Sequence, residues 1–457
     1  MILNRRQLIE NGSDRPTRRA RRLLVETLEF VLTSVDPHRL VSQGVRRKGE
    51  KLLVDREIIR LDHYHSIFVA GAGKASGAMA EALEEILGDR LEGGVVVIPS
   101  GQKPPRLSRV RPAVAPHPIP DESSVRAAKG LVNLVQELGE RDLLICTISG
   151  GGSALLSLPA GPLTIEDKGR VAQLLMNAGA TIVELNTVRK HLSAIKGGWL
   201  AQHSSAGRIL GLLISDVVED RLDTIASGPI SPDSTTFSDA IGILKKYNVW
   251  DLIPSTAVDV LCNGAQGAIP ETPKAGDPCF RKVSHHILGN NRTACTSAQR
   301  YLRSKGINTK ILSSSVTGEA RYLGSFVGSL AREIVTLDEP FRKPCAFVLG
   351  GETTVTVTGS GRGGRNQECM MTCAREIRNL RGAAVASIGT DGIDGTTDAA
   401  GAVVDGMTLS RSESLNLELD ELLVQNDSYR FFQPLEDLVM TGRTNTNVND
   451  VAVAVLL

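Results

Sequence analysis

Short apolar runs alternate along this chain with longer amphipathic segments, and this pattern predicts βαβ units and a largely parallel sheet. Most of the runs are rich in Val, Ile and Leu, as buried strands of parallel sheets are. The predicted strands cover residues 65–73, 93–99, 142–148, 208–215, 285–290, 310–315, 345–351, 353–359 and 383–389.

Amphipathic segments with apolar residues three and four positions apart lie between these runs and predict helices. The predicted helices cover residues 16–34, 74–87, 122–138, 166–183, 187–201, 236–247, 291–304, 318–336 and 366–379. The alternation of the two patterns predicts an α/β fold in both halves of the chain.

A chain of 457 residues is too long for one ordinary hydrophobic core. The stretch 263–282 is rich in Gly and Pro and has no periodicity, and a fresh βαβ pattern begins at His285. The sequence therefore predicts a Rossmann-like domain over 1–275, with a largely parallel sheet, and a second α/β domain over 285–457.

The charge balance excludes partners that bind through a global field. With 52 basic and 51 acidic residues the net charge is +1, so we expect neither nucleic acid nor an anionic membrane as a partner. Seven scattered cysteines without a CxxC pair indicate neither a disulfide framework nor a zinc site. No leader-like apolar region follows the basic start, and no run is long enough to span a membrane, so we expect a cytoplasmic protein.

Residues 149–153, SGGGS, follow an apolar strand and precede an apolar segment. Glycine tolerates positive φ, so the N–H groups of Gly150, Gly151 and Gly152 can converge on an anion between Ser149 and Ser153. A glycine-rich turn of this kind is about as often purely structural. Alone it predicts an anion cradle only weakly.

Basic residues are predicted at the start of three helices. Lys74 follows Gly71 and Gly73, Arg365 follows Gly364, and Arg189 and Lys190 stand near the start of the helix predicted over 187–201. A cation in the first turn opposes the helix dipole by roughly 0.3 to 1 kcal/mol. One such cation is usually a surface residue, but three suggest a bound anion that supplies the missing negative charge.

Carboxylates follow two other strands. Asp216 and Asp220 follow 208–215, and Asp391, Asp394 and Asp398 lie in the glycine-rich loop after 383–389. Strand ends of this kind line the ligand crevice of open α/β sheets. Asp216 and Asp391 are the candidate Mg²⁺ ligands, although at least two of the five acids are expected to be turn or cap residues.

Glycine turns, cations and loop carboxylates together are typical of phosphoryl transfer. No Walker A motif and no protein-kinase HRD or DFG motif occurs. The sequence predicts a phosphoryl-transfer enzyme outside those two groups.

The residues also resemble glycerate 2-kinases of the MOFRL family. The resemblance runs from about residue 20 to the C-terminus, and its ordered motifs are GAGKAS at 71–76, HPIPDE at 117–122, SGGGSAL at 149–155, LNTVRKHLSAIKGG at 185–198, ASGPISPD at 226–233, GGETTVTV at 350–357, GGRNQE at 363–368 and TDGIDGTTDAAG at 390–401.

The resemblance implies an enzyme that uses ATP and Mg²⁺ to convert D-glycerate into 2-phosphoglycerate and ADP. It also implies a MOFRL region over about 344–457 and an active site in the cleft between the domains. The essential Lys and Arg of the family correspond by motif to Lys74 and Arg365.

Our hypothesis assigns Lys74 to glycerate or the transferring phosphoryl group, and Arg365 to the charge that develops in the transition state. Arg189 and Lys190 hold the glycerate carboxylate or a phosphate, and the Ser149–Ser153 turn binds either ATP or glycerate. Asp216 or Asp391 holds Mg²⁺ or orients the 2-hydroxyl. The oligomeric state stays open, with a homodimer among the options.

Two rival functions remain at this point. The first is an NAD(P)H-dependent hydroxypyruvate reductase, because GAGKASG superficially resembles a dinucleotide-binding turn. The spacing G-x-G-x-x-x-G and the lack of an acid after 93–99 argue against it. The second is a sugar-phosphate sensor without chemistry, for which Arg365 and the Asp391 loop have no use.

Overall fold

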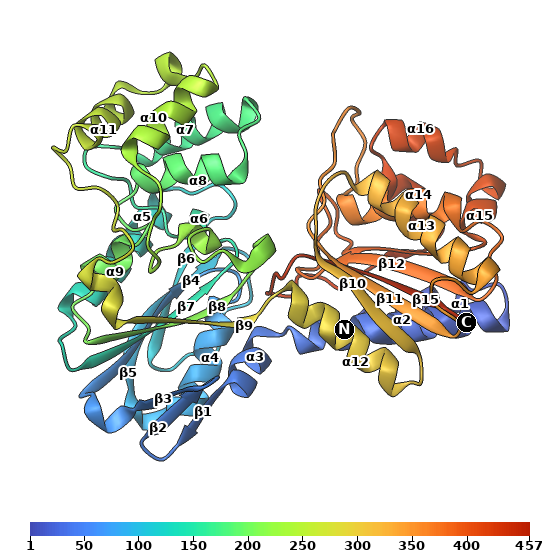
Figure 1. The fold of residues 1–457 in the computed structure, drawn as a ribbon, viewed down its shortest axis with the longest axis horizontal. Coiled ribbons are helices and arrows are strands. Elements are labelled where there is room, and N and C mark those ends of the chain that lie inside the picture. The colour runs from blue at the N-terminus through green and yellow to red at the C-terminus, as the bar shows by residue number, and fades with distance from the viewer. The chain divides into compact units, whose positions relative to one another are not determined.

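The structure, a computed structural model, describes residues 1–457 and divides them into two compact units (Figure 1). We call Pro37–Leu288 the central unit. The terminal unit combines Met1–Asp36 with Gly289–Leu457. The chain therefore passes from one unit to the other twice.

A six-stranded sheet in the order β6-β5-β4-β7-β8-β9 forms the centre of the central unit. The registers from β6 to β8 are all parallel. β7 is buried on both faces, as expected of a parallel strand covered by helices. The strands are β4 (Ser66–Ala72), β5 (Leu91–Pro99), β6 (Val110–Ala115), β7 (Asp142–Ser149), β8 (Arg208–Ile214) and β9 (Val283–Gly289).

Helices of the central unit form two groups. The sheet is covered by α3 (Pro37–Gly44), α4 (Ser76–Leu87), α5 (Glu122–Glu137), α6 (Gly152–Leu155) and α9 (Trp199–His203). A second core lies among α7 (Ile165–Asn177), α8 (Ile182–His191), α10 (Phe237–Lys246) and α11 (Ser255–Ala265). A small antiparallel sheet joins β1 (Val45–Lys48), β2 (Lys51–Val54) and β3 (Glu57–Arg60).

The terminal unit has a mixed six-stranded sheet in the order β10-β11-β15-β12-β13-β14. Its strands are β10 (Asn308–Val316), β11 (Cys345–Gly351), β12 (Ala383–Gly389), β13 (Gly401–Asp405), β14 (Leu438–Val439) and β15 (Asp450–Leu456). Its helices are α1 (Arg5–Glu10), α2 (Arg15–Ser34), α12 (Asn291–Ser304), α13 (Ala320–Leu337), α14 (Arg365–Glu376), α15 (Thr408–Ser414), α16 (Leu419–Val424) and α17 (Ser428–Phe432). β15 pairs antiparallel with both β11 and β12, so the last strand of the chain lies inside the sheet.

The predicted fold class is confirmed, because each unit is built from a sheet covered by helices. Several predicted helices agree with the structure to within about two residues, among them 16–34, 122–138 and 291–304. Their start signals are plain: Asp14 caps α2, and Asp121 and Asn290 form capping boxes.

Four element predictions are wrong. The helix predicted over 166–183 ends at Asn177 as α7, and α8 begins at Ile182. Residues 353–359 form no strand and contribute only an isolated bridge at Thr354. The helix predicted over 187–201 ends at His191 as part of α8, and a separate α9 begins at Trp199. The strand at 285–290 opens no new unit, because β9 lies beside β8 in the central sheet, where Gly211 lets Ser284 approach closely.

The compact units also differ from the predicted division at 275–285, because residues 1–36 pack with the terminal unit. The reason is a buried ion cluster. Arg21 of α2 has no exposed side-chain surface, and its guanidinium lies 2.5 Å from Asp405 and 2.7 Å from Asp437. Amphipathicity predicts α2 itself but cannot reveal which acids will pair with it.

Candidate active site

Two glycine-rich turns lie side by side at the carboxyl ends of β4 and β7. The backbone N–H of Lys74 donates to the carbonyl of Gly150 at 2.9 Å, and the N–H of Ala75 donates to Ser149 Oγ at 3.0 Å. A Cβ on Gly73 would lie 2.1 Å from Ser149 Oγ. The structure therefore brings Lys74 and the predicted anion cradle together.

The cradle has donors that no backbone group uses. None of the N–H groups of Gly150, Gly151, Gly152 and Ser153 donates to a backbone carbonyl. Gly151 has φ of 82°, a left-handed conformation that glycine adopts without strain. Such a run of N–H groups is an anion-binding concavity.

An acid and a histidine border the same turn. A Cβ on Gly150 would lie 2.1 Å from Asp216 Oδ2, and one on Gly151 would lie 3.0 Å from His117 Nε2 and 3.4 Å from the Lys74 side chain. His117 lies in the loop before α5, and Asp216 follows β8. The turn thus has a carboxylate at its Gly150 end.

Three cations gather beyond the other end of the turn. Lys196 is 2% exposed, and its ammonium donates to the carbonyl of Ser153. Lys168 of α7 is 8% exposed, and its ammonium lies 3.4 Å from the carbonyl of Leu158. Arg189 is half-buried in the last turn of α8. We call Lys168, Arg189 and Lys196 the cation cluster.

No member of the cation cluster forms an ion pair. Burial lowers the pKa of Lys168 to about 7, and the charge of Arg189 lowers it further. Burial, followed by the charges of Lys168 and Arg189, holds the pKa of Lys196 well below its ordinary value. The two lysines thus hold their protons less readily than exposed lysines do, because no carboxylate in the chain favours their charged forms.

Lys190 has a different environment from its neighbour Arg189. Its ammonium lies 2.9 Å from Asp233 and 3.7 Å from Asp223, and its side chain is 4% exposed. Both residues stand in the last turn of α8 rather than in a first turn, so the prediction of cations at three helix starts is wrong for this pair. Cations near a helix C-terminus are favoured by the dipole and indicate no ligand by themselves.

Arg365 begins α14 in the terminal unit, as predicted, with Gly364 as the N-cap. Its guanidinium forms a bidentate pair with Asp450, with Nε at 2.6 Å and Nη2 at 3.0 Å, and Nη1 lies 3.0 Å from Glu352. These acids stand at adjacent ends of β15 and β11. They supply part of the charge that the sequence analysis assigned to a ligand.

The acids around Arg365 are buried and repel one another. Burial raises the pKa values of Glu352 and Asp450, outweighing the attraction of Arg365, and Asp391 adds to the rise in both. Burial also raises the pKa of Asp394 to about 6. Asp394 accepts from the backbone N–H groups of Asn366 and Gln367, so it caps α14.

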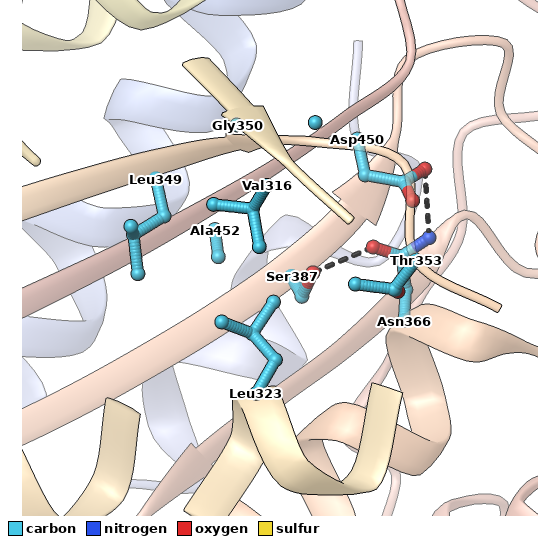
Figure 2. A pocket seen from close by; sticks show the side chains of 10 residues that line it. Val316, Leu323, Leu349, Gly350, Thr353, Asn366, Ser387, Asp450 and Ala452 are labelled. Carbon is cyan, nitrogen blue, oxygen red and sulfur yellow. Dashed lines mark hydrogen bonds between the residues drawn. The ribbon is translucent and has the colours of Figure 1, made fainter. Parts of the chain in front are cut away.

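A small pocket lies beside this clamp, with an empty volume of about 260 Å³. Figure 2 shows Asn366 bridging Asp450 and Ser387 at the polar side of the pocket, while Val316, Leu323 and Ala452 form its apolar side. The Asn366 amide donates to Asp450 at 3.1 Å, and Ser387 donates to Asn366 at 2.5 Å. The pocket is part of the arrangement that fixes the first turn of α14.

The two predicted Mg²⁺ ligands lie in different units, with Asp216 in the central unit and Asp391 in the terminal unit. No group of three or more His, Cys, Asp or Glu side chains in the chain is arranged to hold a metal ion. Near Asp391, the Asn449 amide contacts Glu352 at 3.4 Å, and its buried Oδ1 has no hydrogen-bond donor. This oxygen is of the type that Mg²⁺ prefers.

Sequence reasoning missed Lys168, Lys196, Glu352 and Asp450 as members of these sites. Lys196 and Glu352 stand inside motifs that were recognised, so the motifs themselves contain a signal for them. Lys168 and Asp450 stand in ordinary amphipathic and strand patterns. Only the folded chain brings them to the cation cluster and to Arg365.

The fold and site define a two-unit α/β protein with an anion-binding turn in one unit and an arginine–carboxylate clamp in the other. Residues 23–262 match a family described as a domain of unknown function (DUF4147), and residues 345–450 match the MOFRL family. No helix is long and apolar enough to cross a membrane.

Relatives match over nearly the whole chain. A D-glycerate 2-kinase of Thermotoga maritima is 36% identical over 96% of this chain and 98% of its own length. A glycerate 2-kinase of Pyrococcus horikoshii is 38% identical over 93% and 94% of the two chains. The crystal structure of a glycerate kinase from Thermotoga maritima superimposes with a TM-score of 0.83 at 35% identity, over 95% of this chain and 99% of the other.

The chain therefore belongs to the MOFRL glycerate 2-kinase family. The resemblance inferred from the ordered motifs is confirmed.

Proposed function

We propose that this chain is a kinase that transfers a phosphoryl group from ATP to the 2-hydroxyl of D-glycerate, giving 2-phosphoglycerate and ADP. The names of the two glycerate 2-kinases that match nearly the whole chain support the reaction and imply ATP as co-substrate. The observation that carries the proposal is the pair of turns in the central unit, where N–H groups without a backbone acceptor adjoin Lys74 and a cation cluster without counter-ions.

In the proposed reaction the bond from the γ-phosphorus to the β-phosphate oxygen breaks, and a new bond forms to O2 of glycerate. The hydroxyl proton is released to solvent, and ADP keeps the bridging oxygen. The Gly150–Ser153 N–H groups and Lys74 bind the anionic groups between which the phosphoryl passes. Asp216 is placed beside Gly150 to accept a hydrogen bond from the glycerate hydroxyl. Arg189 binds an acid group of the substrate or product, whereas Lys190 is a structural residue paired with Asp233.

The terminal unit is assigned to charge neutralisation. The guanidinium of Arg365 is held rigidly by Asp450 and Glu352, so it is preorganised for the charge that develops on the phosphoryl oxygens. Two acids on one arginine also limit its net positive charge.

Mg²⁺ fits the residues around Asp391. Burial raises the pKa values of Glu352 and Asp450 despite the attraction of Arg365, so a further cation would favour their charged forms, and the buried Asn449 Oδ1 has no hydrogen-bond donor. We propose that Asp391, with Glu352 and Asn449, holds the ion. A bound Mg²⁺ would neutralise phosphate charge there.

The structure disfavours hydroxypyruvate reduction. In a dinucleotide-binding turn the glycines leave room for the pyrophosphate. Here a Cβ on Gly71 would lie 2.1 Å from the Thr147 carbonyl, and one on Gly73 would lie equally close to Ser149. The glycines of this turn are needed to pack against β7.

The decisive experiment incubates the purified chain with ATP, Mg²⁺ and D-glycerate and follows the products by phosphorus NMR. We expect a 2-phosphoglycerate resonance and stoichiometric ADP, and no oxidation of NADH with hydroxypyruvate. ATP hydrolysis independent of D-glycerate, or formation of the 3-isomer, would contradict the proposal.

Two variants test the assigned residues in the same assay. Lys74→Ala and Arg365→Ala should lower kcat by at least about a hundredfold, the size found when one charged transition-state contact is removed. The matched controls are Lys103→Ala and Arg378→Ala, exposed cations on the same two units that touch neither site. Near-normal turnover in Lys74→Ala or Arg365→Ala would overturn the assignment of that residue.

We also propose a cytoplasmic location, because all seven cysteines are unpaired thiols, as suits a reducing compartment.

A further inference from the structure

The cation cluster places basic side chains in the central unit without an acid partner. Lys168 and Lys196 are both more than nine-tenths buried, and neither has a carboxylate partner. Burying even one unpaired ammonium is costly, and three cations side by side add mutual repulsion. An anionic ligand that binds these cations would offset this free-energy cost.

The hydrogen bonds of the cluster leave donors for that ligand. The Leu158 carbonyl that receives Lys168 at 3.4 Å also accepts from the Ala194 N–H at 3.0 Å and from Ser193 Oγ at 3.1 Å. Lys168 is therefore the third and weakest donor to one oxygen. Lys196 has one acceptor, the Ser153 carbonyl, for its three N–H bonds.

We propose that Lys168, Arg189 and Lys196 form a subsite for the phosphate group of 2-phosphoglycerate, the product of the reaction. This group is a dianion and binds there without a metal ion. This inference rests on the proposed function and names the residues that receive the product. Lys168 and Arg189 contact the phosphate, and Lys196 positions the cradle through Ser153.

The charge count favours a phosphate over a carboxylate. A glycerate carboxylate brings one negative charge to Lys168, Arg189 and Lys196, whereas a phosphate monoester brings close to two and so favours the charged forms of both lysines more strongly. Arg189 can also bind a phosphate through two parallel N–H bonds. The N–H groups of Gly151–Ser153 add neutral donors at the same end of the turn.

The charge distribution along the turn argues against a metal–nucleotide at this end. Asp216 lies at the Gly150 end, and no carboxylate adjoins the cation cluster. A nucleotide with its divalent ion would place further positive charge beside three cations. A phosphate without a metal ion meets no such repulsion.

The experiment measures equilibrium binding by calorimetry, without turnover, to the purified chain and to Lys168→Met, Arg189→Gln and Arg170→Gln. The probes are 2-phosphoglycerate, inorganic phosphate, D-glycerate and ADP with Mg²⁺. Arg170 is an exposed cation on the same helix as Lys168 and serves as the control. Thermal unfolding of each variant confirms that it is folded.

We expect Lys168→Met and Arg189→Gln each to weaken the binding of 2-phosphoglycerate by at least about tenfold, the loss of one charge-assisted hydrogen bond. Inorganic phosphate should weaken in parallel, whereas D-glycerate and ADP with Mg²⁺ should change by less than about threefold. Equal weakening of ADP would assign the cluster to the nucleotide, and equal weakening of D-glycerate would assign it to the carboxylate. Either result overturns the inference.

Failure of the proposed function gives a different result. A chain that makes no 2-phosphoglycerate but still binds it through Lys168 and Arg189 has the subsite without the reaction. A chain with normal turnover whose variants bind 2-phosphoglycerate normally has the reaction without the subsite.

Discussion

The two units differ in whether their buried cations have carboxylate partners. In the terminal unit, Arg21 and Arg365 each face two carboxylates at ion-pairing distance. In the central unit, Lys168 and Lys196 face none. Carboxylates accordingly raise the pKa values of both arginines, whereas burial and neighbouring cations lower those of both lysines.

This difference distinguishes buried cations that stabilise the fold through ion pairs from buried cations that are available to bind an anionic ligand. A buried ion pair is complete in itself, and removal of one partner leaves an uncompensated charge. A buried cation without a partner lowers the stability of the free protein, so its removal should stabilise the fold and weaken ligand binding. Lys190 tests this reading, since it lies in the central unit but is paired with Asp233.

The largest expected effect on stability comes from Arg21. Arg21→Met leaves Asp405 and Asp437 buried without their main cation, and we expect a loss of about 3–5 kcal/mol in the free energy of unfolding. Urea unfolding followed by circular dichroism measures it, with the exposed neighbour changed in Arg22→Met as control. Equal stability of the two variants would mean that the ion pairs of Arg21 do not stabilise the fold.

The comparison also shows what the sequence could and could not predict. The position of Arg365 at a helix start follows from a local pattern and is found as predicted. Lys74 follows its glycine turn as expected but lies before α4, which begins at Ser76 rather than at Lys74. Whether a cation is paired depends on residues far along the chain. Lys190 and Lys196 stand in one recognised motif, yet Asp233 neutralises the first and the second has no acid.

The same reason explains the errors in the fold. The pattern LNTVRKHLSAIKGG keeps a helical spacing past His191, where α8 ends and the chain turns to place Lys196 beside Ser153. The strand at β15 has small residues buried on both faces, so it lacks the alternation that marks a half-buried strand. Residues 353–359 have that alternation but no strand partner. In each of these three segments, tertiary contacts rather than the local pattern determine whether a helix or strand forms.

A smaller loss of stability should follow from Lys190→Met. Asp233 would lose its cation but keep hydrogen bonds from Thr235 and Thr272, so we expect a loss of about 3 kcal/mol, at the low end for a buried pair. Lys246→Met, which breaks an exposed pair with Glu184, should leave the free energy of unfolding nearly unchanged. A Lys190→Met protein as stable as Lys246→Met would mean that Lys190, like Arg189, belongs to the ligand.

The smallest effect is a pH dependence carried by Lys168. Its pKa is about 7 in the folded chain and near its ordinary value of 10.5 in the unfolded chain. Above pH 7 the unfolded chain therefore binds more protons, and stability rises with pH, by about 1 kcal/mol between pH 7 and pH 8. Below pH 7 both states hold the proton, and this contribution to the slope disappears.

Denaturant titrations at fixed ionic strength measure the change of stability with pH. The Lys168→Met variant should lose this dependence, and at pH 7 it should unfold at a higher denaturant concentration than the parent chain. Because a bound phosphate restores the proton to Lys168, saturating 2-phosphoglycerate should flatten the slope of the parent chain as well. If the pH dependence of stability persists in Lys168→Met and in the parent chain with 2-phosphoglycerate, another group carries it. The contrast between the unpaired cation cluster and the paired arginines of the terminal unit would then lose its support.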